Sequence, residues 1–89
     1  MKSFITVIGK DTVGIIAGLS AILAERNVNI LDINQTVMEG MFTMIMMVDT
    51  SDLTCSFSEL STLLSDYGKD AGLSVRMQRE EIFNTMHRI

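Results

Sequence analysis

One stretch decides the fold: Met38-Glu39-Gly40-Met41-Phe42-Thr43-Met44-Ile45-Met46-Met47-Val48. From residue 28 to residue 48 the apolar residues follow a mixed periodicity, and the Glu39-Gly40 pair interrupts this segment. Glycine at such a break is typical of a tight turn. We therefore predict a hairpin of two strands, residues 28–38 and 41–49, that turns at the glycine. The first strand carries several polar side chains, whereas the second is apolar on both faces, as expected of a strand inside a sheet.

Upstream of the hairpin, the sequence predicts a strand and a helix. Residues 4–8 are short, β-branched and apolar and end at Gly9, which indicates a strand buried on both faces. After Gly14, apolar residues recur on one face of a helix, and Asn27 is a suitable place for that helix to stop. The apolar positions of this helix are Ile15, Ile16, Leu19, Ile22 and Leu23.

Downstream of the hairpin, a second helix and a last strand follow. Ser56 and Glu59 have the spacing of a capping box, in which each side chain satisfies a backbone N–H at the helix start. The helix ends at Gly68 or at Gly72. Residues 73–78 then alternate between apolar and polar, which predicts a strand with one face in water. The buried stripe of the helix is Phe57, Leu60, Leu63, Leu64 and Tyr67.

The last residues predict a short amphipathic C-terminal helix, because Ile82, Phe83, Met86 and Ile89 recur at helical spacing. The element order is then βαββαβ plus a terminal helix. This order predicts an α+β fold, a ferredoxin-like sandwich of a four-stranded antiparallel sheet with two helices on one face. The first and third strands are expected in the centre of the sheet. Residues 1–89 fit a single domain.

The predicted sheet has one face that its two helices leave uncovered. Phe4, Ile8 and half of the Met-rich third strand point to this face, and exposed apolar patches of that size usually mark an interface. Either the C-terminal helix covers the face, or a second subunit does, or the terminal helix of one subunit lies on the sheet of another. The eight methionines fit a core as well as an adaptable binding surface.

Composition argues against several classes of partner. The net charge is −4 and the pI is about 4.7, and the seven Lys and Arg residues are scattered, which disfavours nucleic acid and anionic membrane surfaces. The single cysteine, Cys55, cannot form an intramolecular disulfide, and the sequence contains neither a signal-peptide pattern nor an apolar stretch of bilayer length. We therefore expect a cytoplasmic protein.

Catalytic and metal-binding motifs are not expected either. The spacing from Gly9 to Gly14 resembles that of a P-loop, but Ile15 follows where that motif requires Lys. His87 is the only histidine, so we expect no metal site and no Ser/His/Asp catalysis. Asp49 and Asp52 flank a loop and are interpreted as solvated carboxylates, with a weak cation site as a minor alternative. We predict a protein that is not an enzyme and needs no cofactor.

Three features together resemble the ACT domain family: the loop from Gly9 to Ile15, the pair Asn29-Ile30 at the start of the second strand, and the βαββαβ order. The resemblance covers essentially the whole chain and is nearest to small bacterial proteins that consist of one ACT domain, akin to modules in glycine cleavage repressors. Such domains typically bind amino acids or other small ligands at dimer interfaces, between the first loop of one subunit and the second strand of another. The resemblance therefore implies a regulatory homodimer that binds a small molecule, with a regulated protein as a further partner.

The resemblance also implies a set of ligand-binding residues, and the chemistry of the loop agrees with it. A helix N-terminus suits a carboxylate, and Gly14 lets the backbone approach a ligand, while Gly9 permits a tight exit from the strand. Asp11 either receives an ammonium group or caps the helix. Asn29 either offers a donor and an acceptor to the ligand or closes the turn after the helix. The implied residues are Asp11, Thr12, Val13, Gly14, Ile15, Asn29 and Ile30.

Two other functions compete with the binding of an amino acid. The first is a ligand-independent module that uses its apolar sheet face for association with itself or with another protein. The second is an RNA-binding domain of the ferredoxin-like type, which stacks bases on sheet aromatics in a basic surround. Because the third strand offers only Phe42 among its methionines and the chain is acidic, the RNA-binding hypothesis is the weakest of the three.

Overall fold

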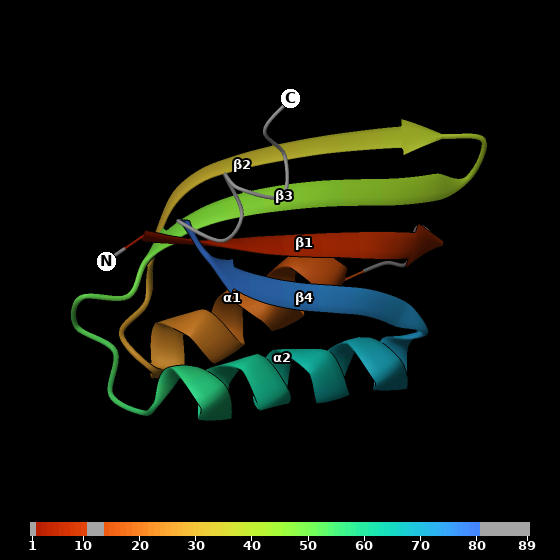
Figure 1. Cartoon of the computed structure of the whole chain (residues 1–89). Coiled ribbons are helices and arrows are strands. Elements are labelled where there is room, and N and C mark those ends of the chain that lie inside the picture. The colour runs from red at the N-terminus through yellow and green to blue at the C-terminus, as the bar shows by residue number, and fades with distance from the viewer. Residues whose placement is uncertain (1, 11–13, 81–89) are drawn as a thin grey trace.

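The computed structural model describes residues 2–10 and 14–80. Its elements in chain order are β1 (Lys2–Lys10), α1 (Ile15–Glu25), β2 (Asn29–Met38), β3 (Met41–Asp49), α2 (Phe57–Ala71) and β4 (Leu73–Arg79). The strands form one antiparallel sheet in the order β2-β3-β1-β4, and both helices lie on the same side of it (Figure 1). The ferredoxin-like prediction is confirmed for this part of the chain, with β1 and β3 in the centre. The predicted terminal helix falls outside the described residues.

The hairpin forms where the sequence predicts it. Glu39 and Gly40 both have positive φ, 51° and 79°, and Met38 pairs with Met41 across the turn. Two consecutive residues with positive φ are characteristic of a type I′ turn, whose twist matches that of the flanking strands. The turn therefore fixes the register of β2 against β3.

The core lies between the helices and one face of the sheet. On that face β1 contributes Ile5 and Val7, which are fully buried. On the opposite face Phe4 is only partly buried and Ile8 is 44% exposed. The expectation that β1 is buried on both faces is therefore wrong for the described part of the chain, because helices pack against one face only. The remaining fully buried apolar side chains are Leu19, Leu23, Met44, Met46, Val48, Leu60 and Leu64.

Gly9 has a different role from the predicted one. β1 does not end at this residue but continues to Lys10, and Gly9 pairs with Phe42 on one side and Leu73 on the other. A Cβ atom at position 9 would collide with the side chain of Leu73. Glycine is therefore required for close packing against β4, and not for a turn.

The ends of the helices follow the predicted signals. The Oγ of Ser56 accepts a hydrogen bond of 3.0 Å from the N–H of Glu59, which is the N-terminal half of the capping box. Gly72, with φ of 76°, ends α2, whereas Gly68 lies inside that helix. Asn27, with φ of 59°, follows the C-terminal cap of α1. Left-handed residues at these positions let the chain leave each helix and enter the next strand.

Candidate functional site

An open hollow of about 600 Å³ lies at the turn between α1 and β2. It is lined by Asn27, Val28, Asn29, Asp52 and Leu53. Val28 is buried and Leu53 is half-buried, whereas the two amides and the carboxylate are exposed. The hollow thus offers one anionic acceptor and two neutral donor–acceptor groups beside two apolar residues, a set that can hold an ammonium group.

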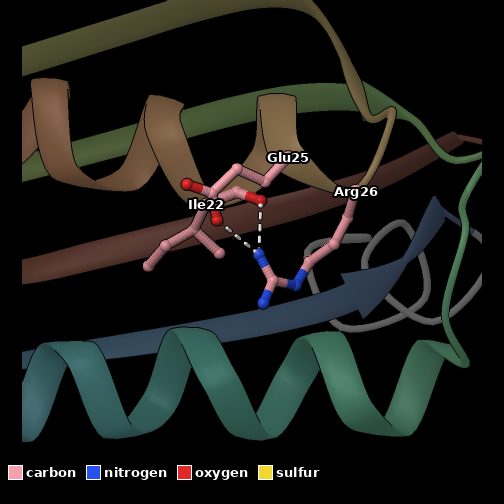
Figure 2. A network of polar contacts seen from close by, with 3 residues as sticks. All are labelled: Ile22, Glu25 and Arg26. Carbon is pink, nitrogen blue, oxygen red and sulfur yellow. Dashed lines mark hydrogen bonds and ion pairs between the residues drawn. The ribbon is translucent and has the colours of Figure 1, made fainter.

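Arg26 lies directly before the hollow in the sequence and is bonded to the last turn of α1 (Figure 2). Its Nη1 donates to the carbonyl of Ile22 at 3.3 Å and to Oε2 of Glu25 at 3.1 Å. A cation on the last carbonyls of a helix also complements the negative end of the helix dipole. The N–H of Val28 donates to the carbonyl of Leu23 at 2.9 Å, so the chain turns directly from the helix into the hollow.

The opposite wall is the loop between β3 and α2. The N–H of Thr54 donates to the carbonyl of Arg26 at 3.1 Å, which joins this loop to the turn after α1. Within the loop, Oδ1 of Asp49 accepts hydrogen bonds from the Oγ of Ser51 at 2.6 Å and from its N–H at 2.9 Å. These bonds, with the side-chain bond as the larger cause, lower the pKa of Asp49 from 3.8 to about 2. The loop that carries Asp52 is therefore ordered by its own hydrogen bonds.

The start of α1 forms the second part of the candidate site. Gly14 is the N-cap residue with φ of 87°, it is exposed, and it carries no side chain that could cap the helix. The first turn of α1 contains no acidic residue, so no carboxylate within it opposes the positive end of the helix. Ile15 is 4% exposed, which leaves only its backbone to face a ligand. Asp11, Thr12 and Val13 lie outside the described residues.

The two parts of the candidate site lie at opposite ends of one subunit. The strand register places Asn29 at the end of the sheet where β1 begins. Met38 lies at the other end, level with Lys10, from which the chain continues toward Gly14. Among the described residues, the structure therefore does not bring Gly14 and Ile15 together with Asn29 and Ile30 within a single subunit.

Of the five residues of the hollow, sequence reasoning assigned only Asn29 to a ligand; it considered Asp52 only for a weak cation site and missed Asn27, Val28 and Leu53. The only signal was the cluster of polar residues after β3, which by itself is typical of any loop. The side chain of Ile30, another predicted ligand-binding residue, is half-buried and packs against the core.

Two further observations concern residues 2–10 and 14–80. No group of three or more His, Cys, Asp or Glu side chains in these ranges is arranged to hold a metal ion. Within the same ranges, neither helix has the length and hydropathy needed to cross a membrane.

Comparison with known proteins gives one family. The sequence model of the ACT domain matches residues 4–78. A UPF0237 protein of Clostridium acetobutylicum is 56% identical over 89 residues, with all of both chains covered.

Solved structures give the same result. An ACT domain protein from Streptococcus pneumoniae superposes with a TM-score of 0.79 and 41% identity, over 93% of each chain. A protein described as a glycine cleavage system transcriptional repressor superposes with a TM-score of 0.72 and 23% identity, over 86% of this chain and 44% of that one. At this lower identity the second comparison shows the fold alone.

Proposed function

This chain belongs to the ACT domain family, and on that premise we propose that it is a non-catalytic regulatory domain, which binds an amino acid as a cytoplasmic homodimer. One observation supports this proposal above the others. The two chemically complementary parts of the site, the hollow beside Asn29 and the start of α1 at Gly14, lie at opposite ends of one subunit. A second copy is the simplest means of bringing them together.

The exposed edge of β2 suits such a pairing. All eight of its residues after Ile30 are exposed, and they include Leu31, Ile33, Val37 and Met38. A long edge strand with apolar side chains is a natural template for pairing with another chain. Two β2 strands that pair antiparallel about a two-fold axis would place Asn29 of the partner subunit next to Met38, at the end of the sheet where α1 begins.

The chemistry of the shared site fits a zwitterion. Asp52 and the two asparagine amides would hold the ammonium group, while the positive end of α1 beyond Gly14 would attract the carboxylate. The ligand residues proposed in the first loop (Asp11, Thr12 and Val13) would add to this second part. Each site would thus hold the ammonium group of the ligand in the hollow of one subunit and its carboxylate at the start of α1 of the other subunit.

A thermal-shift screen against the twenty amino acids tests the proposal. A ligand at one hundred times its dissociation constant should stabilise the protein by about 2.7 kcal/mol. Asp52→Ala should remove this shift, whereas Asp66→Ala, which changes an exposed carboxylate on α2, should keep it. Gly14→Val should also remove it, because φ of 87° is strained for any residue with a side chain.

Mixed dimers test whether the site is shared. Subunits with Gly14→Val and subunits with Asp52→Ala should each fail to bind as homodimers. When the two are mixed, a shared site predicts that half of the sites in each heterodimer are intact, so binding returns. A site contained in one subunit predicts no recovery, because every subunit then carries a damaged site.

The ligand-independent association module remains the second candidate. The observation that favours it is the same exposed edge of β2, which can pair without any ligand. This candidate predicts a dimer that is stable in the absence of amino acids and shows no thermal shift with any of them. Light scattering during the amino-acid screen separates the two functions.

A further inference from the structure

A groove of about 390 Å³ lies between the C-terminal half of α2 and the start of β4. Within residues 2–10 and 14–80, β4 is the last strand of the sheet, and no other strand pairs with its outer edge (Figure 1). The groove, called the β4 groove below, therefore opens beside a row of backbone N–H and C=O groups that an added strand can use. Two buried apolar side chains, two hydroxyl groups and two basic groups line it: Leu73, Val75, Ser65, Ser74, Lys69 and Arg76.

We propose that the β4 groove binds an acidic, extended segment of another protein, which pairs with β4 as a further strand of the sheet. The proposal is independent of the amino-acid site, because no residue of the groove belongs to the hollow beside Asn29 or to the start of α1. It rests on three features: the regular edge of β4, the short side chains of α2 beside this edge, and the positive charges around it.

The edge of β4 is suited to receive another strand. From Arg79 back to Leu73, the strand pairs with β1 without a bulge. It contains no proline, so each of its residues has a backbone N–H. Bulges and prolines are two of the features that keep an exposed edge from pairing, and β4 has neither. Backbone hydrogen bonds to an added strand can therefore form along the whole of β4.

The side of α2 next to β4 leaves room for the side chains of an added strand. Residues four apart on a helix lie on one face, and one such row begins at Phe57, which contacts Arg79 of β4. The row continues through Ser61 and Ser65, both half-buried, and ends at Lys69 in the β4 groove. Between its bulky first and last members, the row thus consists of short side chains that both donate and accept hydrogen bonds.

Three basic side chains surround the edge of β4. Lys69 lies at the end of the groove next to the start of the strand. Arg76 pairs with Thr6 and therefore projects from the sheet face opposite the helices, whereas the guanidinium of Arg79 lies 4.4 Å from the centre of the Phe57 ring on the helix side. No carboxylate among the described residues lines the groove. Acidic side chains of an added strand would thus meet a positive charge on either face of the sheet.

The same charges disfavour a second copy of this chain at this edge. If two β4 strands paired along their full length about a two-fold axis, Arg76 would lie opposite Arg76 of the partner subunit. Like charges directly opposite each other on paired strands are destabilising. The two edges of the sheet therefore suit different occupants: the apolar edge of β2 suits a second copy, and the basic edge of β4 suits an acidic segment of another protein.

Titration of the full-length protein with a synthetic peptide tests the proposal. The probe is a capped peptide of alternating glutamate and valine, about eight residues long so that it spans β4. Backbone amide signals of residues 73–79 should shift on titration, with a dissociation constant of about 1 mM or lower. A peptide with lysine in place of glutamate should not bind, because its charge is reversed. A glutamate peptide with proline at its central valines should bind at least about tenfold more weakly, because it lacks backbone donors for strand pairing.

Two protein variants with the same change in net charge locate the site. Arg76→Gln should raise the dissociation constant of the glutamate peptide about threefold. Thr62→Glu also makes the net charge more negative by one, but on an exposed position of α2 outside the groove, and should leave the dissociation constant unchanged. Both residues are exposed, so both variants should keep the amide spectrum of the folded protein.

Four outcomes would overturn the proposal. The first is that the glutamate peptide shows no saturable binding, which would mean that the basic residues only guard the edge against aggregation. The second is that the lysine or the proline peptide binds as tightly as the glutamate peptide. The third is that the amide shifts fall on β2 and not on β4. The fourth is an equal loss of affinity in Arg76→Gln and Thr62→Glu, which would show that net charge alone attracts the peptide.

Discussion

The two edge strands of the sheet, β2 and β4, have opposite surroundings. Every second residue of β4 (Leu73, Val75, Met77) is buried, and α2 runs alongside this strand (Figure 1). β2 is longer, ten residues against seven, but none of its residues is buried and no helix covers it in the described part of the chain. The difference teaches that the subunit completes its own core on the β4 side and leaves the β2 side exposed, where the proposed second copy would pair.

The largest effect is expected from a change that separates α2 from β4. Gly68 lies where the helix approaches the strand most closely, and a Cβ atom there would collide with the side chain of Val75. Gly68→Val should lower the free energy of unfolding by about 3 kcal/mol through overpacking. Chemical denaturation measures this loss. Asp70→Val introduces the same side chain at an exposed position of α2 and should cost less than about 1 kcal/mol. Equal losses in the two variants would contradict the described packing of β4.

The next effect concerns association and not folding. Ile33 is 38% exposed on β2, and Ile33→Lys places a charge on the edge where the second copy is proposed to pair. The free energy of unfolding should change by less than about 0.5 kcal/mol, while the dimer dissociation constant should rise at least about tenfold. Sedimentation equilibrium measures the second quantity. Leu63→Lys changes a residue of equal exposure, 37%, on α2 and should leave the dissociation constant unchanged.

A smaller effect is expected at the turn that positions β2. Glu39 has φ of 51°, a conformation that costs a residue with a long side chain about 1 kcal/mol, whereas Asn adopts it more readily. Glu39→Asn should therefore raise the free energy of unfolding by about 0.5–1 kcal/mol. Gly40→Ala should lower it by a similar amount, since Gly40 also has positive φ, 79°. The same sign of change in both variants would contradict the type I′ geometry.

The fold could be predicted from the sequence because its signals are local. The capping box at Ser56, the glycine at the hairpin turn and the strict alternation of residues 73–78 each depend on neighbours a few positions away. The order of the strands then follows from the element order. The prediction for Gly9 was wrong because its reason is not local: the residue is small to make room for Leu73, which lies 64 positions further along the chain.

The candidate site could be predicted only in part, and for the same reason. Asn29 and Gly14 were predicted as ligand-binding residues from their resemblance to a family pattern, which specifies residues but not the hollow beside Asn29. Asp52 was missed as part of that hollow, since it is brought to the rim by the hydrogen bond from Thr54 to Arg26, a contact between two loops distant in sequence. No periodicity indicates such a contact. Chemistry that depends on two loops, or on two subunits, requires the structure.

The smallest expected effect is a pH dependence of the free energy of unfolding, which arises in the loop after β3, next to the start of β2. Asp49 pairs with Asn29, and the bonds from Ser51 hold its pKa at about 2 in the folded state, against 3.8 for the unfolded chain. Because the folded value is the lower one, the carboxylate stabilises the fold above about pH 4, and this contribution is lost as the pH falls from about 4 toward 2. Ser51→Ala removes the shorter hydrogen bond, so the pKa of Asp49 should rise toward its ordinary value. Titration of the Asp49 carboxyl carbon by NMR measures that shift.

Denaturation at two pH values then shows whether the charge of Asp49 contributes to the free energy of unfolding. At pH 6 Asp49→Asn should be less stable than the unchanged protein, because the variant lacks the stabilising carboxylate. At pH 2.5 this difference in stability should shrink, because the unchanged protein then loses most of the contribution of that carboxylate to protonation. A difference that stays constant between the two pH values would mean that Asp49 stabilises the loop through its shape and not through its charge. In that case the loop would still support the hollow beside Asn29, but lowering the pH in this range would not loosen it.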